Sequence, residues 1–214
     1  QVLELIPAIK KPETPLSLRE KLKWTAIVLA VYFILFSVPA VGTSTAALNQ
    51  PAIQLISIIF AARIGSLITV GIGPIVLSSI VLQLLQGSGA VDVNMEDPVQ
   101  KTRFQGIQKL AALLIAIVES VVFVATGYVP IASASLFGIV ALQLGIGAIS
   151  VIYLDETMTK WGITSGLNMF IASGVAFSIV GGTVSIILPE AAAAITNGGS
   201  AAIPNALMAF GPLF

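Results

Sequence analysis

The chain has 214 residues and no formal net charge; 57% of its residues are hydrophobic, only 9% are charged, and its mean hydropathy is +1.02. This composition predicts an integral membrane protein. The chain has no Cys and no His, which excludes disulfides, Cys-ligated zinc, a Ser-His dyad and an HExxH zinc site within it.

Residues 1–16 predict a peripheral segment on the membrane surface, because three prolines prevent one continuous helix, and residues 1–22 together are the expected cytoplasmic segment. Ser17 and Glu20 have the spacing of a capping box and predict a helix start there. The first membrane span is expected over 23–38. The first residue is Gln, so we expect a longer gene product, and no cleavable signal peptide is apparent.

The next apolar stretch, 51–86, is interrupted by glycines and by Pro74. Its second part, 71–86, reaches about 24 Å as a helix, less than the roughly 30 Å hydrocarbon core. Its first part, 51–66, predicts a separate short helix. Broken spans are tolerated only where the freed backbone is buried in protein or lines a water-filled cavity, and transporters and channels keep their sites there. The pattern favours a transport pathway; a kinked structural helix behind a re-entrant loop is the alternative.

Three further spans are expected over 107–128, 136–154 and 167–188, followed by a tail, 189–214, without a clear full span. With five crossings, every Lys and every Arg except Arg63 falls on one side of the membrane. The positive-inside rule therefore predicts a cytoplasmic N-terminus and an external C-terminus. Arg63 on its own is read either as an outer-interface residue or as a functional one.

Two apolar pairs share a helix face at i,i+4 spacing: Ile72 with Val76, and Leu167 with Ile171. Branched apolar residues around a cavity can form a constriction that gates by dewetting, but the same spacing is common in core packing. Both readings stay open on spacing alone.

Three polar residues lie inside apolar stretches. Glu119 is costly at membrane depth and is therefore a candidate functional residue; a protonated carboxyl that bonds a neighbouring helix is the structural alternative. Ser78 and Ser79 form a small polar patch on the short helix, or bond back to its backbone. No cofactor or metal site is predicted.

Three stretches carry a family resemblance: SLITVGIGPIV at 66–76, FQGIQKL at 104–110, and IYLDE with KWGITSG at 152–166. In this order and spacing they closely resemble the SecY subunit of the protein-conducting channel, in its archaeal form. The family implies an all-α membrane fold of ten transmembrane helices in two inverted halves. This chain resembles the N-terminal half, with five transmembrane helices, the second of them broken.

The resemblance also implies roles for individual residues. A plug closes the channel from outside, a hydrophobic ring lines the pore, a lateral gate opens toward lipid, and an external hinge region covers 189–214. By position, the plug residues are Ile53, Leu55, Ile56, Ile59, Phe60, Arg63 and Ile64; the ring residues are Ile72, Val76, Leu167 and Ile171; the gate residues are Ser78, Ser79 and Glu119.

The implied function is passive conduction of unfolded polypeptide, with release of transmembrane segments sideways into lipid, and the chain is not expected to be an enzyme. The implied partners are the SecE/gamma and small beta subunits, the C-terminal half of the same protein, a translating ribosome, signal sequences, nascent polypeptides and the bilayer, without direct nucleic-acid recognition. The expected location is the plasma membrane, as a multi-pass protein. The rival interpretation is half of an inverted-repeat secondary transporter with Glu119 as an ion or proton site.

Overall fold

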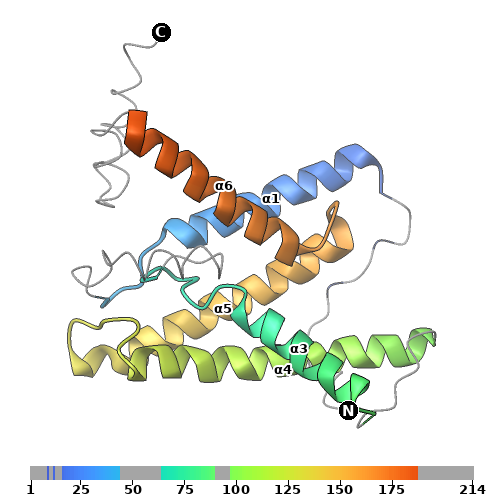
Figure 1. The fold of residues 1–214 in the computed structure, drawn as a ribbon, viewed down its shortest axis with the longest axis horizontal. Helices are drawn as coiled ribbons and strands as arrows, with labels where there is room; N and C mark the ends of the chain where they lie inside the picture. Colours follow the sequence, from blue (N-terminus) through green and yellow to red (C-terminus); the bar gives the residue numbers. More distant parts are fainter. Residues whose placement is uncertain (1–8, 10–11, 13–15, 44–63, 90–96, 188–214) are drawn as a thin grey trace. The chain divides into compact units, whose positions relative to one another are not determined.

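The computed structural model describes residues 9, 12, 16–43, 64–89 and 97–187 (Figure 1). Within these ranges the chain is mainly helical. The α-helices are α1 (Leu18–Ser37), α3 (Gly73–Gly87), α4 (Pro98–Ala125), α5 (Phe137–Trp161) and α6 (Gly166–Ile187), and a short 3-10 helix, η3 (Ala134–Leu136), precedes α5.

Two stretches in the described ranges, Gln100–Ala125 and Ala134–Trp161, are helical, long enough and apolar enough to cross a membrane. Gly73–Gly87 and Gly166–Phe177 are shorter apolar helices. The chain divides into two compact units, 1–171 and 172–214, and in the second the described residues continue α6. The predicted plug residues 53–63 and the hinge region 189–214 lie outside the described residues.

The predicted capping box is confirmed at the start of α1. The amide of Glu20 donates to the Ser17 hydroxyl oxygen (3.3 Å), and the Ser17 amide donates to a Glu20 carboxylate oxygen (2.9 Å). These two bonds satisfy orphan donors of the first turn. The hydrogen bonds from the Ser17 amide and hydroxyl also lower the pKa of Glu20.

Residues 64–72 form a buried, non-helical turn segment between the end of α1 and the start of α3. Gly71 has a φ of +60° there, a region that glycine adopts without strain. The loop after α1 supplies backbone partners, since the Ala40 amide donates to the Gly65 carbonyl (2.8 Å) and the Leu67 amide to the Val38 carbonyl (3.0 Å). The segment therefore keeps its backbone bonded without forming a helix.

A side chain of the same segment completes this bonding. The Thr69 hydroxyl accepts from the Gly65 amide (3.0 Å) and donates to the Ser66 carbonyl (2.6 Å). On the other side of the α1 loop, the Gln143 side-chain amide both accepts from and donates to the backbone of Val41, at 2.9 and 3.1 Å. The side chains of Thr69 and Gln143 thus provide main-chain groups with hydrogen-bond partners that another strand would provide in a sheet.

Helix α4 packs on α3 and α5, and α1 packs on α5. Small residues let α4 approach α5 closely: Ala112 and Ala116, four residues apart on α4, are buried with Val140, Leu144 and Ala148 of α5. These contacts form one of two hydrophobic clusters. Ile64, expected to belong to the plug, is buried in this cluster.

Helix α4 starts nine residues before the predicted span 107–128 and ends three residues before the span does, and helix α5 continues seven residues past the predicted span 136–154. Helix α4 starts at Pro98, where the Asp97 carbonyl accepts from the Lys101 amide (3.0 Å) and proline occupies the first helical position. Helix α5 continues to Trp161, and its indole ring lies 5.2 Å from that of Trp24. The predictions concern membrane spans, and the polar turns at the start of α4 and the end of α5 lie outside those ranges.

We expect Gly147→Ala to destabilise the protein, because α5 passes directly against the turn segment. A Cβ on Gly147 would lie 1.7 Å from the Leu67 carbonyl oxygen, so the backbone would have to shift. Overpacking of this kind costs about 1–3 kcal/mol. The measurement is the melting temperature of the complete channel in detergent.

The matched control is Gly138→Ala on the same helix, where a Cβ would meet nothing within 4 Å. It should leave the melting temperature unchanged or raise it slightly, since alanine is the better helix former. Equal melting temperatures for the two variants would contradict the close approach.

Candidate functional site

Three of the four predicted ring residues meet in the second hydrophobic cluster. Ile72 is 3% exposed, and Val76 and Leu167 pack against the same cluster. Its buried members are Val28, Tyr32, Phe36, Ile68, Ile72, Val151, Met158 and Phe170, and we call it the Ile72 cluster. The fourth residue, Ile171, is 37% exposed and is not among these members.

Aromatic stacking fixes the start of α6 on α1 in this cluster. The rings of Tyr32 and Phe170 are stacked with centroids 4.5 Å apart and planes at 11°, and both side chains are fully buried. Offset stacking adds about 0.5–1.5 kcal/mol beyond the area buried. The start of α6 therefore packs on α1 in the Ile72 cluster.

The polar patch of α3 faces α4. Ser78 is fully buried, and its hydroxyl donates to the Ile75 carbonyl (2.9 Å). The Ser79 hydroxyl donates to the same carbonyl (2.7 Å) and accepts from the side-chain amide of Gln108. Both serines bond back to the helix, as the alternative interpretation expected, and Ser79 also links α3 to α4.

Glu119 lies on α4 against the first turn of α3. Its carboxyl oxygens lie 3.0 and 3.3 Å from the position that a Cβ on Gly73 would occupy. One of them, Oε2, is buried and accepts no hydrogen bond from the residues that the structure describes. The N-terminal end of a helix carries partial positive charge, so the carboxyl is placed where an anion is stabilised. Sequence reasoning selected Glu119 but did not predict this partner helix.

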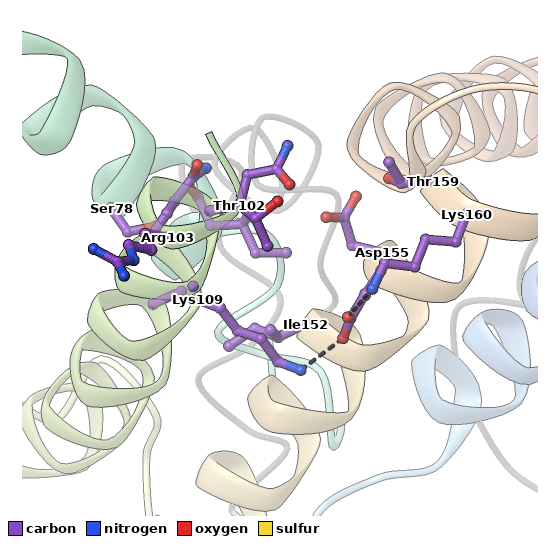
Figure 2. Close-up of a pocket in the computed structure, with 14 residues that line it drawn as sticks. Ser78, Thr102, Arg103, Lys109, Ile152, Asp155, Thr159 and Lys160 are labelled. Atoms are coloured by element: carbon purple, nitrogen blue, oxygen red, sulfur yellow. Dashed lines mark hydrogen bonds and ion pairs between the residues drawn. The ribbon is translucent and has the colours of Figure 1, made fainter. Parts of the chain in front are cut away.

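A cavity of about 780 Å³ lies between α3, α4 and α5 (Figure 2). Its wall is apolar near Ile75, Ala112 and Ile152 and charged near Lys109 and Lys160. Figure 2 shows the ammonium groups of Lys109 and Lys160 converging on one carboxylate. The wall of the cavity is therefore apolar beside α3 and charged near Lys109, Asp155, Glu156 and Lys160, which form what we call the charged rim.

Asp155 and Glu156 are neighbours in the charged rim of the cavity wall and form bonds to different helices. Asp155 Oδ1 accepts from the Leu167 amide at 2.8 Å and so bonds an orphan donor in the first turn of α6. Glu156 accepts from Lys109 of α4 at 2.6 Å and from Lys160 of α5 at 2.7 Å. The two carboxylates join α4, α5 and α6.

The sequence analysis named Asp155, Glu156 and Lys160 only as parts of a family motif and did not predict that the two carboxylates bond to α4 and α6. The i,i+4 spacing of Glu156 and Lys160 was a local signal that could have found one ion pair. The partners at Lys109 and Leu167 are set by tertiary structure and left no local signal. Among the described residues, no group of three or more His, Cys, Asp or Glu side chains is placed to hold a metal ion.

Residues 66–212 match the family model for SecY. The chain belongs to the SecY family. The protein translocase subunit SecY of Methanocaldococcus jannaschii is 43% identical over 86% of this chain and 42% of that protein's length. The subunit of Methanococcus vannielii is 41% identical over 83% of this chain and 40% of its own length. The chain thus spans about two-fifths of the length of these SecY proteins, and like them it is a membrane protein.

Solved protein-conducting channels match the fold of this chain over about two-fifths of their own length. A chain described as the structure of a protein conducting channel matches with a TM-score of 0.74 and 42% identity, covering 86% of this chain and 41% of that one. Sec61 in a canine ribosome-channel complex from the endoplasmic reticulum matches with the same TM-score and identity. A third, with a TM-score of 0.71, is described as showing that the plug domain of SecY stabilises the closed state and maintains a membrane seal.

Asp155→Ala should loosen the first turn of α6, because the Leu167 amide loses its acceptor. Removal of a helix cap costs about 0.5–2 kcal/mol. Hydrogen exchange followed by mass spectrometry should show faster exchange at 167–170. Asp155→Asn retains an acceptor oxygen and should have a smaller effect.

The control is Asn168→Ala, since Asn168 is exposed on the same turn. Unaltered exchange in Asp155→Ala would mean that Asp155 does not hold α6.

Proposed function

We propose that the chain forms the N-terminal half of a protein-conducting channel that passes unfolded polypeptide across the plasma membrane and releases transmembrane segments into lipid. The observation that carries the proposal is the SecY match over most of the chain, joined to an apolar cluster around Ile72. The proposed subunit is a passive conduit and not an enzyme. The opposing half, supplied by the remainder of the protein, completes the pore.

The proposed throat uses Ile72, Val76, Leu167 and Ile171. A narrow apolar throat disfavours ions, because a dry neck cannot replace their hydration. It also offers a passing peptide no fixed hydrogen bonds, which suits a channel that accepts any sequence. Ile171 is the exposed member in this half, and in the proposal it faces the pore that the other half encloses.

The proposed plug is the segment 51–66, beneath the throat on the external side. What supports it is its position between α1 and the short helix α3, together with the plug described for a related SecY structure. The proposed lateral gate includes Ser78, Ser79 and Glu119 along the contact of α3 with α4. Movement of α3 away from α4 would break the hydrogen bond from Gln108 to Ser79.

The proposed topology has five crossings and a cytoplasmic N-terminus, from the one-sided distribution of Lys and Arg. The proposed partners are the C-terminal half, the SecE/gamma and small beta subunits, signal sequences, nascent chains and a translating ribosome. The related canine channel in a ribosome complex supports the last of these. The translating ribosome is also the proposed energy source.

Changing Ile72, Val76 and Ile171 together to Ser in the complete channel should raise its resting ion conductance. Hydroxyl groups would let water enter the throat, and ions would follow. Single-channel recording in planar bilayers measures this effect.

A matched triple change of Ile139, Leu142 and Ile146 to Ser, all exposed on α5, should leave the closed state unaltered. An unchanged closed state in the throat variant would mean that these residues are ordinary packing. Melting temperatures of both variants separate leakage from loss of the fold.

Glu119→Leu should shift how hydrophobic a signal sequence must be to enter the membrane, whereas Glu119→Gln should have a mild effect. The Glu119 carboxyl lies against α3 and is partly buried by protein. If α3 moves away and lipid takes its place, exposure of this polar side chain to lipid costs free energy, and leucine removes that cost. Insertion of a series of signal sequences of graded hydrophobicity measures the shift.

Glutamine keeps the polar group and removes only the titratable proton. Complete loss of transport in Glu119→Gln, with normal assembly, would favour the transporter interpretation over the channel.

A further inference from the structure

The backbone of Ile9 is held at the end of α5. Its amide donates to Glu156 Oε1 (3.1 Å), and its carbonyl oxygen accepts from Lys160 Nζ. Glu156 and Lys160 are four residues apart and paired with each other at 2.7 Å. One ion pair thus satisfies both main-chain polar groups of one residue that is 147 positions away from Glu156 in the sequence.

The ion pair is held in place by α4. Lys109 Nζ lies 2.6 Å from Glu156 Oε2 and 4.3 Å from the centroid of the Tyr153 ring. The Glu156 and Lys109 side chains are only 15% and 14% exposed, so water competes little for these bonds. The carboxylate therefore keeps one oxygen for Lys109 and offers the other to Lys160 and Ile9.

This arrangement fits a peptide main chain and not a particular side chain. A carboxylate oxygen beside an ammonium group presents one acceptor and one donor, the same pair that a neighbouring β-strand offers to an extended residue. Peptides recognised in this way take affinity from main-chain hydrogen bonds. The hydrogen bonds from the Ile9 amide to Glu156 and from Lys160 to the Ile9 carbonyl are both of this type.

We propose that Glu156 and Lys160 form a clip for extended peptide main chain, and that its occupant is the chain's own N-terminal segment at Ile9. Through this clip Ile9 ties the region before α1 to α4 and to the C-terminal end of α5. This proposal does not depend on the conduction of polypeptide.

Chain length and existing contacts support this occupant. Helix α1 starts nine residues after Ile9, a distance that extended chain covers over about 30 Å. The start of α1 already meets the end of α5, because the Thr25 hydroxyl accepts from the Ile163 amide at 3.3 Å. The contact at Ile9 therefore lies only nine residues from a helix that is itself bonded to the chain just after α5. Pro12 and Pro15 between Ile9 and α1 reduce the conformational entropy lost when this segment is ordered.

The test is electron paramagnetic resonance of a nitroxide attached at Ala8→Cys in the complete channel, with any cysteines outside this chain replaced. This chain has no cysteine, so within it the label is unique. Glu156→Ala removes the acceptor. Ile9→Pro removes the Ile9 amide donor, changes the Ile9 side chain and leaves the ion pairs of Glu156 in place. Both should shorten the rotational correlation time of the label about tenfold, from the slow to the fast nanosecond range.

Two controls separate main-chain from side-chain binding. Ile9→Ala keeps both main-chain groups and should leave the label immobile, as should Thr159→Ala at an exposed position beside the clip. A mobile label in Ile9→Ala would overturn the proposal, because the side chain would then be the anchor. An immobile label in Ile9→Pro would overturn it as well. Because Ile9→Pro spares Lys109, Glu156 and Lys160, its result stands even if Glu156→Ala disturbs the fold.

Discussion

The structure depends on satisfying the main-chain polar groups of a non-helical segment buried between helices. In a membrane an unpaired amide or carbonyl group is costly, so irregular backbone survives only where protein supplies partners. Residues 64–72 obtain them from the loop after α1 and from the Thr69 hydroxyl. The same segment carries Ile68 and Ile72 into the hydrophobic cluster. The hydrogen bonds of this segment therefore determine where α3 can begin and which of the segment's side chains enter the Ile72 cluster.

Much of the helical plan could be predicted from the sequence, because apolar runs and local caps are short-range signals. Ser17 and Glu20 marked the start of α1, and Pro74 with its flanking glycines marked the break before α3. The polar turns of α4 and α5 lie outside the predicted spans, since hydrophobicity defines the membrane-embedded part of a helix and not its end. The Asp97-Pro98 pair is a signal for the start of α4, but the prediction rested on the apolar pattern and did not use it.

The candidate site was less predictable, and the reason is distance along the chain. Ser79 meets Gln108 across 29 positions, and Glu156 meets Lys109 across 47. No periodicity in one helix reports which residue of another it will touch. Asp155 and Glu156 show the local part of the logic: successive residues of a helix point about 100° apart, so neighbouring carboxylates reach different partners. The family resemblance supplied positions for the ring and gate, and the bonds around them had to come from the structure.

Helix α4 has 28 residues and is therefore about 42 Å long, whereas the hydrocarbon core is about 30 Å thick. Roughly two of its turns must stand clear of the acyl chains unless it lies strongly tilted. The ion pair of Lys109 with Glu156 joins α4 to α5 in the part of α4 nearer its N-terminus. The polar N-terminal turns of α4, which carry Lys101 and Arg103, are therefore the part of this helix that we expect to reach into water.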